Sequence, residues 1–376
     1  MPSTTSPTTK TRSVENERLA AYAPMQVRLH KYKRDPERLP KREITPRSLE
    51  IIAAVARYKF LPSSMIVGLI DGDRSNVYRH LQALYHNEYL NRFSFPRVGN
   101  PGEFIYYLDN TKALDLLASS GLAERAALDY EGVRNNREKA YFEINLSSHI
   151  DDVQGRLMHL HHELMISRFH FMLEAGCRAA AGRVTLKRWQ QGSSLWHSIE
   201  APKVSYDTKD NWREMEETEF IPHRPDAFFT LFFPKESEGR QYANFFYEAD
   251  RHKTSIKKHN RKLRGHFHYV VKHRRHVEDY GIKRVRAVLV ESIHDGWADQ
   301  LRRGARHGSV SGSKPSPLFW FTTSAVFTKP REVEQHGRAQ AVPQFLLKPE
   351  VIFNRIWLTP TDPDEPQAEH FKSLLE

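Results

Sequence analysis

Two stretches decide the fold: Arg224-Pro225-Asp226-Ala227-Phe228-Phe229 and, further along the chain, Phe245-Phe246-Tyr247-Glu248-Ala249-Asp250. Each is an apolar run typical of a buried β-strand, and each carries acidic residues in its middle or at its end. A sheet holds carboxylates rigidly, and Mg²⁺ prefers oxygen ligands. The two stretches therefore predict neighbouring strands with a metal site built on Asp226 and Glu248. In the simpler alternative, Asp226 pairs with Arg224 or Arg251.

A strongly basic segment follows the second stretch. Between Arg251 and Arg275 the chain has ten lysines and arginines and no acid. Its apolar spacing predicts a helix over about 255–278, with Lys258, Lys262, Arg264 and Lys272 exposed. A solvated helix face usually mixes both signs, so this block favours contact with phosphates. We expect Lys257, Lys258 and Arg261 to bind DNA.

The composition agrees with a polyanionic partner. The 376 residues carry a formal net charge of +11, and 39% of them are hydrophobic, as in ordinary globular proteins. The single cysteine, Cys177, excludes an internal disulfide framework and a cysteine-based zinc finger. No apolar run approaches the roughly 20 residues that span a bilayer. The sequence predicts a cytosolic protein without a membrane partner.

The N-terminal third predicts a DNA-binding unit. A basic arm over 1–42 precedes three helices, which begin at Pro46, near Ser63 and at Arg74. Two strand-like runs, 89–95 and 104–108, then flank a Gly/Pro-rich loop. Three helices followed by a hairpin are typical of a winged helix-turn-helix, which we assign to 43–120.

The third helix of this unit is the predicted recognition helix. Its apolar residues share one face, and we expect its polar face to enter the major groove of double-stranded DNA. That face carries Arg74, Ser75, Asn76 and Arg79, and Arg97 lies in the wing. Winged helices also serve as dimerisation or interaction modules, so this alternative stays open.

The rest of the chain predicts a second domain. Residues 121–150 form a charged connector, and a long helix opens the domain at about residue 151. The acidic stretch 190–220 predicts an irregular insertion. The domain continues to about residue 330, and 331–376 is a Pro-rich, acidic C-terminal extension that we expect to be disordered or peripheral. The predicted fold class is mixed α/β (α+β), with an αβββαβ order in the second domain.

That order, with an acid in the second strand and an acid-x-polar pair in the third, resembles the PD-(D/E)xK nuclease superfamily. The winged-helix front end and the phrases Arg224-Pro225-Asp226-Ala227 and Glu248-Ala249-Asp250-Arg251 look like the replication-relaxation family, associated with plasmids and other mobile elements of bacteria. The resemblance runs from about residue 44 to residue 329. It implies a role in replication, mobilisation or its control.

The resemblance also implies a set of catalytic and metal-binding residues. Asp226, Glu248 and the carbonyl of Ala249 would hold Mg²⁺ or Mn²⁺, and Glu163 matches an additional acid of the first helix. Asp250 stands where the superfamily usually has lysine. Two hypotheses address this departure: Lys262 replaces the lysine from the following helix, or Asp250 binds a second metal ion.

Three functions remain open at this point. The first is DNA binding with metal-dependent DNA cleavage, and the second is a non-catalytic DNA-binding regulator or initiator on the same fold. The third is an interaction scaffold in which the winged helix mediates dimerisation. Expected partners are double-stranded DNA and either a second copy of the chain or other replication and mobilisation proteins.

Overall fold

The helical N-terminal unit forms where local sequence signals predict it. The computed structural model describes residue 34 and residues 43–97, 100–123, 128, 132–133, 153–207, 211–251, 255–335, 338–347 and 349–376. The arm over 1–42, apart from Arg34, and most of the connector over 121–150 lie outside these residues. The elements of the unit are α2 (Pro46–Tyr58), β1 (Leu61–Pro62), α3 (Ser63–Leu69), α4 (Arg74–His86), β2 (Leu90–Arg97), β3 (Asn100–Leu108) and α5 (Lys112–Ser119).

Capping side chains fix the starts of α2 and α4. The Thr45 hydroxyl accepts from the N–H of Ser48 at 3.3 Å, and Asp73 accepts from the N–H of Asn76 at 2.9 Å. β3 lies between β1 and β2 in one antiparallel sheet. The predicted helices at Pro46 and Arg74 and the predicted hairpin are therefore confirmed.

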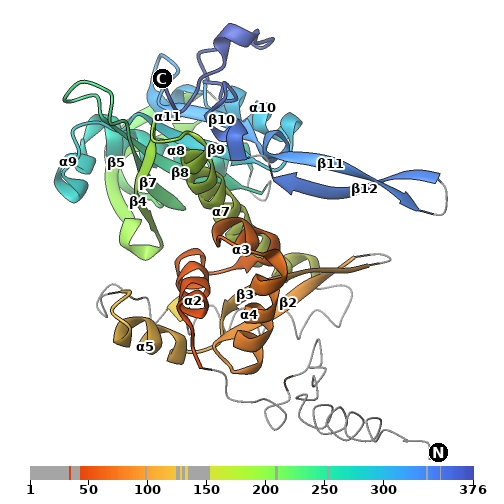
Figure 1. Cartoon of the computed structure of the whole chain (residues 1–376). Coiled ribbons are helices and arrows are strands. Elements are labelled where there is room, and N and C mark those ends of the chain that lie inside the picture. Colours follow the sequence, from red (N-terminus) through yellow and green to blue (C-terminus); the bar gives the residue numbers. More distant parts are fainter. Residues whose placement is uncertain are drawn as a thin grey trace, which may run out of the picture.

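A five-stranded mixed sheet forms the centre of the larger unit (Figure 1). Its order is β10-β9-β8-β7-β4, with β4, β7 and β8 antiparallel and β8, β9 and β10 parallel. The strands are β4 (Thr185–Gln191), β7 (Ala227–Phe232), β8 (Tyr242–Asp250), β9 (Ala287–Ser292) and β10 (Phe319–Thr323). Together with the small sheets and helices around it, this makes the chain a mixed α/β protein, as predicted.

Helices cover both faces of this sheet. Phe229, Phe245 and Tyr247 pack with α7 (Val153–Ala179), whereas Phe228 and Phe246 pack with α8 (Ile256–Phe267). The side chains alternate between the two faces because successive residues of a strand point in opposite directions. Further elements complete the unit: the π-helical turn η4 (His268–Lys272), α9 (Arg275–Tyr280), α10 (Asp295–Gly304) and α11 (Gly308–Ser311).

The two units share one hydrophobic core, in which α7 packs against the N-terminal helices. Polar contacts add to it: the Ser167 hydroxyl donates to the carbonyl of Tyr58 at 2.9 Å, and Arg178 donates to the carbonyl of Leu69 at 3.0 Å. In Figure 1, α7 runs from the sheet to α2 and α3. These contacts fix the helical unit relative to the sheet.

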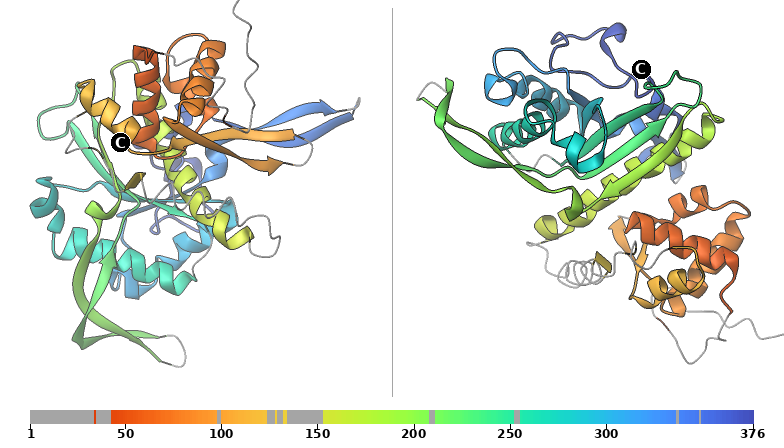
Figure 2. Two further views of the ribbon diagram at one scale, coloured as in Figure 1. Left: turned by 90° about the horizontal axis from the view of Figure 1, so that it is seen from below. Right: turned by 90° about the vertical axis from the view of Figure 1, so that its left-hand side faces the viewer.

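The stretch 190–220 corrects one prediction. Most of it forms a long antiparallel hairpin of β5 (His197–Tyr206) and β6 (Trp212–His223), which extends away from the sheet (Figure 2). Glu219 of β6 pairs with Arg261 at 2.7 Å and with Arg264 at 3.4 Å. The acids that suggested an irregular loop therefore neutralise part of the basic helix.

The predicted helix over 255–278 is also interrupted. The π-helical turn follows α8, and Arg274 adopts a left-handed conformation with φ of 53° before α9 begins. Arg264, predicted to be exposed, is 3% exposed and donates to the carbonyl of Pro202. The inward turn of this arginine is explained by the hairpin that covers α8.

The C-terminal segment is neither disordered nor peripheral in its described part. A hairpin of β11 (Thr328–Gln335) and β12 (Arg338–Leu347) is followed by the short helices η6 (Pro349–Phe353) and η7 (Ala368–His370). Ile352, Trp357 and Leu374 are fully buried in the core beside α7. Arg302 is 1% exposed and donates to the carbonyl of Asp362 at 3.0 Å. The C-terminal segment is thus part of the core of the sheet domain.

We predict that Gly265→Ala destabilises the fold. A Cβ atom at this position of α8 would lie 2.1 Å from the carbonyl oxygen of Pro222, which is backbone and cannot rotate away. The expected loss is about 1–3 kcal/mol of unfolding free energy, measured by chemical denaturation. Gly296→Ala in α10 is the control, because nothing lies within 4 Å of its added Cβ. Equal stability of the two variants would contradict the close packing of β6 on α8.

Candidate functional site

Strand pairing fixes the position of Asp226. Its N–H donates to the carbonyl of Tyr247 at 3.0 Å, and its Oδ2 accepts from the N–H of Ala249 at 2.8 Å. Ala227 pairs with Tyr247, so Asp226 lies at the start of β7 beside Glu248 of β8. The two acids predicted to neighbour each other therefore lie on adjacent strands.

Glu248 is buried and held by two residues of α8. Its side chain is 2% exposed, and it forms an ion pair with Lys262. On its other oxygen, His266 Nε2 lies 2.5 Å from Glu248 Oε1. Lys262 and His266 are four residues apart and so share a helix face. A buried carboxylate needs such partners, because removing a charge from water is costly.

Lys262 is the cation on which the acids of the site converge. Burial acts to lower the pKa of Lys262, but the charges of Glu248, Asp226 and Asp250 outweigh burial and raise the pKa above its ordinary value. Burial likewise acts to raise the pKa of Asp226, whereas Lys262 and His162 hold it well below its ordinary value. Lys262 is therefore protonated and Asp226 ionised at neutral pH.

His162 of α7 contacts this site. Its Nε2 lies 3.3 Å from Asp226 Oδ2. Glu163, the residue predicted from the family pattern, is half-buried next to it and acts on the charge of His162. Adjacent residues of a helix point about 100° apart, so His162 and Glu163 approach the site from different directions.

A second histidine lies behind His266. His223 Nδ1 is 2.9 Å from His266 Nδ1, and the His223 ring stacks on Tyr269 with a centroid distance of 3.7 Å. Burial lowers the pKa of His223 well below its ordinary value, so it is neutral at neutral pH. Sequence reasoning missed the roles of His162 and His223. The one signal for His266 was its spacing of four residues from Lys262.

Asp250 occupies a separate position on the same strand face. Its Oδ1 accepts from Trp297 Nε1 at 2.6 Å, and His259 Nδ1 lies 3.6 Å from its Oδ2. Glu248 and Asp250 are two residues apart on β8 and so point to the same side of the sheet. Asp250 adds negative charge near Lys262.

The donor atoms suit a hard divalent cation in part. Two carboxylates on neighbouring strands match the way Mg²⁺ is usually held, with one or two carboxylates and the remaining positions filled by water and substrate phosphate. Within the described residues, no group of three or more His, Cys, Asp or Glu side chains is placed to hold a metal ion. A cation here would thus depend on Asp226, Glu248 and non-side-chain ligands.

The predicted DNA-contacting residues of α4 all lie on its open face. The exposed residues are Arg74, Ser75, Asn76 and Arg79. Arg79 donates to the side chain of Asn76 at 3.4 Å, and Arg74 lies over the ring of Tyr78 at 5.5 Å. Arg97 is the last residue of β2, at the end of the hairpin.

The predicted DNA-contacting residues of α8 differ in their surroundings. Lys258 is exposed, and Lys257 lies over the ring of Tyr206 at 3.9 Å from its centroid. Arg261 is half-exposed and pairs with Glu219. The basic surface is thus smaller than the sequence predicted, because β6 supplies acids to it.

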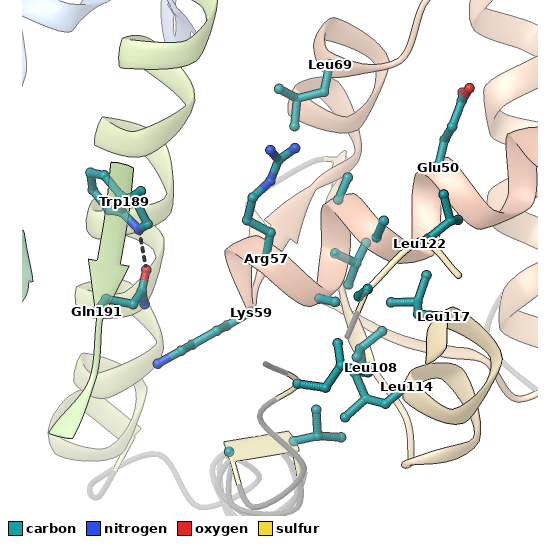
Figure 3. A pocket seen from close by; sticks show the side chains of 18 of the residues that line it. Glu50, Arg57, Lys59, Leu69, Leu108, Leu114, Leu117, Leu122, Trp189 and Gln191 are labelled. Atoms are coloured by element: carbon teal, nitrogen blue, oxygen red, sulfur yellow. Dashed lines mark hydrogen bonds between the residues drawn. The ribbon is translucent and has the colours of Figure 1, made fainter. Parts of the chain in front are cut away.

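A cavity of about 830 Å³ separates the helical unit from β4 (Figure 3). Arg57 and Lys59 lie between α2 and the strand that carries Trp189 and Gln191. Neither Asp226 nor Glu248 lines this cavity. The acidic cluster lies instead at the strand ends, so cavity size does not identify the candidate site.

The family comparison agrees with the sequence phrases around the acids. The model of the replication-relaxation family matches residues 52–285, which is more than half of the chain and includes Asp226, Glu248 and Lys262. The chain belongs to this family. Membership associates it with replication. No curated protein and no solved structure is found to match it. Among the described residues, no helix is long and apolar enough to cross a membrane.

We predict that His162 titrates above its ordinary pKa of 6.5. Burial acts to lower this pKa, but the charge and hydrogen bond of Asp226 outweigh burial. Asp226→Asn should therefore lower the titration midpoint of His162, measured by NMR and assigned with His162→Gln. Glu163→Gln should lower it less, because Asp226 is the larger cause. An unchanged midpoint in Asp226→Asn would contradict the contact.

The same contact predicts the pH dependence of stability. Because the folded-state pKa of His162 is raised, its stabilisation is fully present below 6.5 and is lost as the pH rises through the folded-state value. His162→Gln should therefore cost more unfolding free energy at acidic pH than at alkaline pH, as denaturation at the two pH values would show.

Proposed function

We propose that this protein binds DNA in the replication or mobilisation of a plasmid or other mobile element, and cleaves it with a divalent metal ion. The observation that carries the proposal is the convergence of Asp226, Glu248 and Lys262 at the ends of neighbouring strands and the helix that follows them. Two carboxylates can hold a divalent metal ion, and a lysine beside them can stabilise negative charge that develops on a phosphate.

The fold supports this proposal through its order of elements. α7, β4, β7, β8, α8 and β9 follow one another along the chain, with the β5–β6 hairpin inserted after β4. This is the αβββαβ order expected of a PD-(D/E)xK-like domain. The acids stand at the second and third of these strands, and Lys262 of the following helix would take the place of the lysine that the third strand lacks.

The chain's own residues would divide the work as follows. Asp226, Glu248 and the carbonyl of Ala249 would hold Mg²⁺ or Mn²⁺, whose chemistry is to polarise the scissile phosphate and lower the pKa of a bound water. Lys262 would stabilise negative charge developing on the phosphate, since its ammonium is held protonated among the acids. His162 would keep Asp226 ionised and oriented.

The helical unit would position the DNA. Its element order and its hairpin support the assignment of a winged helix-turn-helix, in which α4 would enter the major groove and the β2–β3 hairpin would contact the backbone. Arg74, Asn76 and Arg79 provide donors for base edges and phosphates.

One observation favours a second function, that of a non-catalytic regulator or initiator. Both oxygens of Glu248 already contact side chains of the protein, Lys262 and His266. If these partners hold Glu248 permanently, the acids balance charge within the fold and the protein acts only by gripping DNA.

Cleavage assays separate the two functions. We expect wild-type protein to nick supercoiled and linear DNA with Mg²⁺ or Mn²⁺ and not with EDTA. Asp226→Ala and Lys262→Ala should each reduce the rate at least about 100-fold, because each removes several kcal/mol of stabilisation. Exposed Glu365→Ala is the control for loss of an acid and should cut normally.

DNA binding measured in the same experiments shows how an absence of cleavage is to be interpreted. Equal DNA binding by wild type and Asp226→Ala with no cutting by either would reject the nuclease and leave the regulator. Absence of salt-sensitive DNA binding in both would reject both functions and leave the interaction scaffold.

We predict that Arg79→Ala weakens DNA binding through α4. Loss of a bidentate base contact typically costs about 1–3 kcal/mol, which corresponds to roughly 5- to 150-fold in affinity. The check is a titration of target and random duplexes at several salt concentrations. Arg355→Ala removes the same charge from the C-terminal segment, where Arg355 pairs with Glu376, and should have no effect. Equal affinities of the two variants would exclude Arg79 from the interface.

A further inference from the structure

The base of the β5–β6 hairpin exposes two large aromatic side chains. Trp196 is 52% exposed and Phe220 is 69% exposed. Ile199 and Ile221 of the same hairpin are buried in the core around α8. Because side chains alternate along a strand, Phe220 lies on the opposite, open face, and Trp196 directly precedes β5. Large apolar side chains exposed together on a strand face indicate a binding surface.

Each of these aromatic residues has an arginine beside it. The guanidinium of Arg224 lies over the Trp196 ring at 5.4 Å from its centroid. Arg261 donates to the backbone carbonyl of Phe220 at 3.5 Å. Arg224 is exposed, and the side chain of Arg261 is 49% exposed. Aromatic rings interleaved with arginines suit nucleobases and phosphates.

The hairpin base is continuous with the candidate site. Arg224 precedes Asp226 by two residues, and Arg261 directly precedes Lys262. His197 pairs with His223, which places Trp196 opposite Arg224 at the end of the hairpin nearest Asp226. Phe220 lies on β6, four residues before Arg224 in the chain, which corresponds to about 13 Å from Arg224 at ~3.3 Å per residue. A strand lying across both rings would lead to the acids.

We propose that Trp196 and Phe220, with Arg224 and Arg261, bind unpaired nucleotides of the DNA strand that enters the Asp226–Glu248 site. This inference rests on the proposed DNA-binding function and names its substrate as DNA with a single-stranded segment. Bases of an intact duplex are stacked on one another, so only unpaired bases can stack on these rings. Exposed acids farther along the hairpin repel phosphates and confine the strand to its base; these are Glu214, Glu216 and Glu217. Glu200 lies opposite Phe220 in the hairpin, and its carboxylate accepts a hydrogen bond from the Thr218 hydroxyl.

The test is a comparison of single-stranded and duplex DNA binding in EDTA. The probes are a fluorescein-labelled thymidine oligonucleotide and a duplex of matched length. The double variant Trp196→Ala/Phe220→Ala should bind the thymidine oligonucleotide at least about 10-fold more weakly, with duplex binding unchanged. Tyr242→Ala is the matched control, because Tyr242 is 53% exposed at the other end of β8. It should bind both probes as wild type does.

A second readout separates stacking from general damage. Trp196 is one of six tryptophans, and an unlabelled thymidine oligonucleotide should quench its fluorescence. Trp196→Phe should keep most of the affinity and lose that quenching, since phenylalanine still stacks. Equal single-strand affinity of wild type and the double variant would overturn the proposal, as would equal losses on both probes. A concentration-dependent dimer abolished by the double variant, without a change in DNA affinity, would also overturn it and assign the rings to self-association.

The same titration with Asp226→Ala separates this proposal from the nuclease. Binding that depends on Trp196 but persists in Asp226→Ala supports the aromatic surface even if no cleavage occurs. If cleavage is lost in Asp226→Ala and single-strand affinity does not depend on Trp196, the nuclease proposal stands and the proposed aromatic surface is rejected.

Discussion

The pairing of β7 with β8 is the constraint on which the candidate site depends. It places Ala227 opposite Tyr247, and the N–H of Ala249 then reaches the carboxylate of Asp226. A shift of one residue would turn Glu248 to the face covered by α7 and Tyr247 to the face covered by α8. The buried aromatic residues on both faces prevent such a shift. The acids are therefore positioned by the hydrophobic core rather than by each other.

The burial of Glu248 explains why α8 is basic where it meets the sheet. A carboxylate that is 2% exposed is tolerated only with charged or hydrogen-bonding partners, and Lys262 and His266 supply them from one helix face. The same ammonium also lowers the pKa of Asp226. An internal cation thus stabilises the cluster before any ligand arrives. A metal ion would have to share Glu248 with Lys262, or its binding would have to displace Lys262 toward the phosphate.

Local signals in the sequence predicted much of the fold, because capping residues and apolar spacing act within a few residues. Pro46 and Arg74 start α2 and α4 as expected, and Asp226 and Glu248 lie on paired strands. The hairpin over 197–223 was missed because its charge partners on α8 are distant in sequence. The buried tail was missed because its apolar runs, 351–353, 356–358 and 374–375, are too short to indicate a helix or strand.

The family pattern named Glu163 on α7, and the structure adds the neighbouring His162 at Asp226. The pattern gives the helix and the approximate turn, but one residue changes the direction of a side chain by about 100°. The packing of α7 on β4 and β8 brings His162 to Asp226. Likewise, the sequence identified Lys262 as one of two ways to replace the usual lysine, and the structure places it against Glu248.

One helix connects the two ends of the proposed DNA path. His162 contacts Asp226, and five residues later Ser167 binds the carbonyl of Tyr58 at the end of α2. Five residues of helix span about 7.5 Å, so the acids and the helical unit are attached to neighbouring turns of α7. The shared core leaves little freedom between them. DNA held by α4 would therefore meet the acids at a fixed distance from the bound sequence. The position of the helical unit would then determine which phosphate of the DNA lies at the acids.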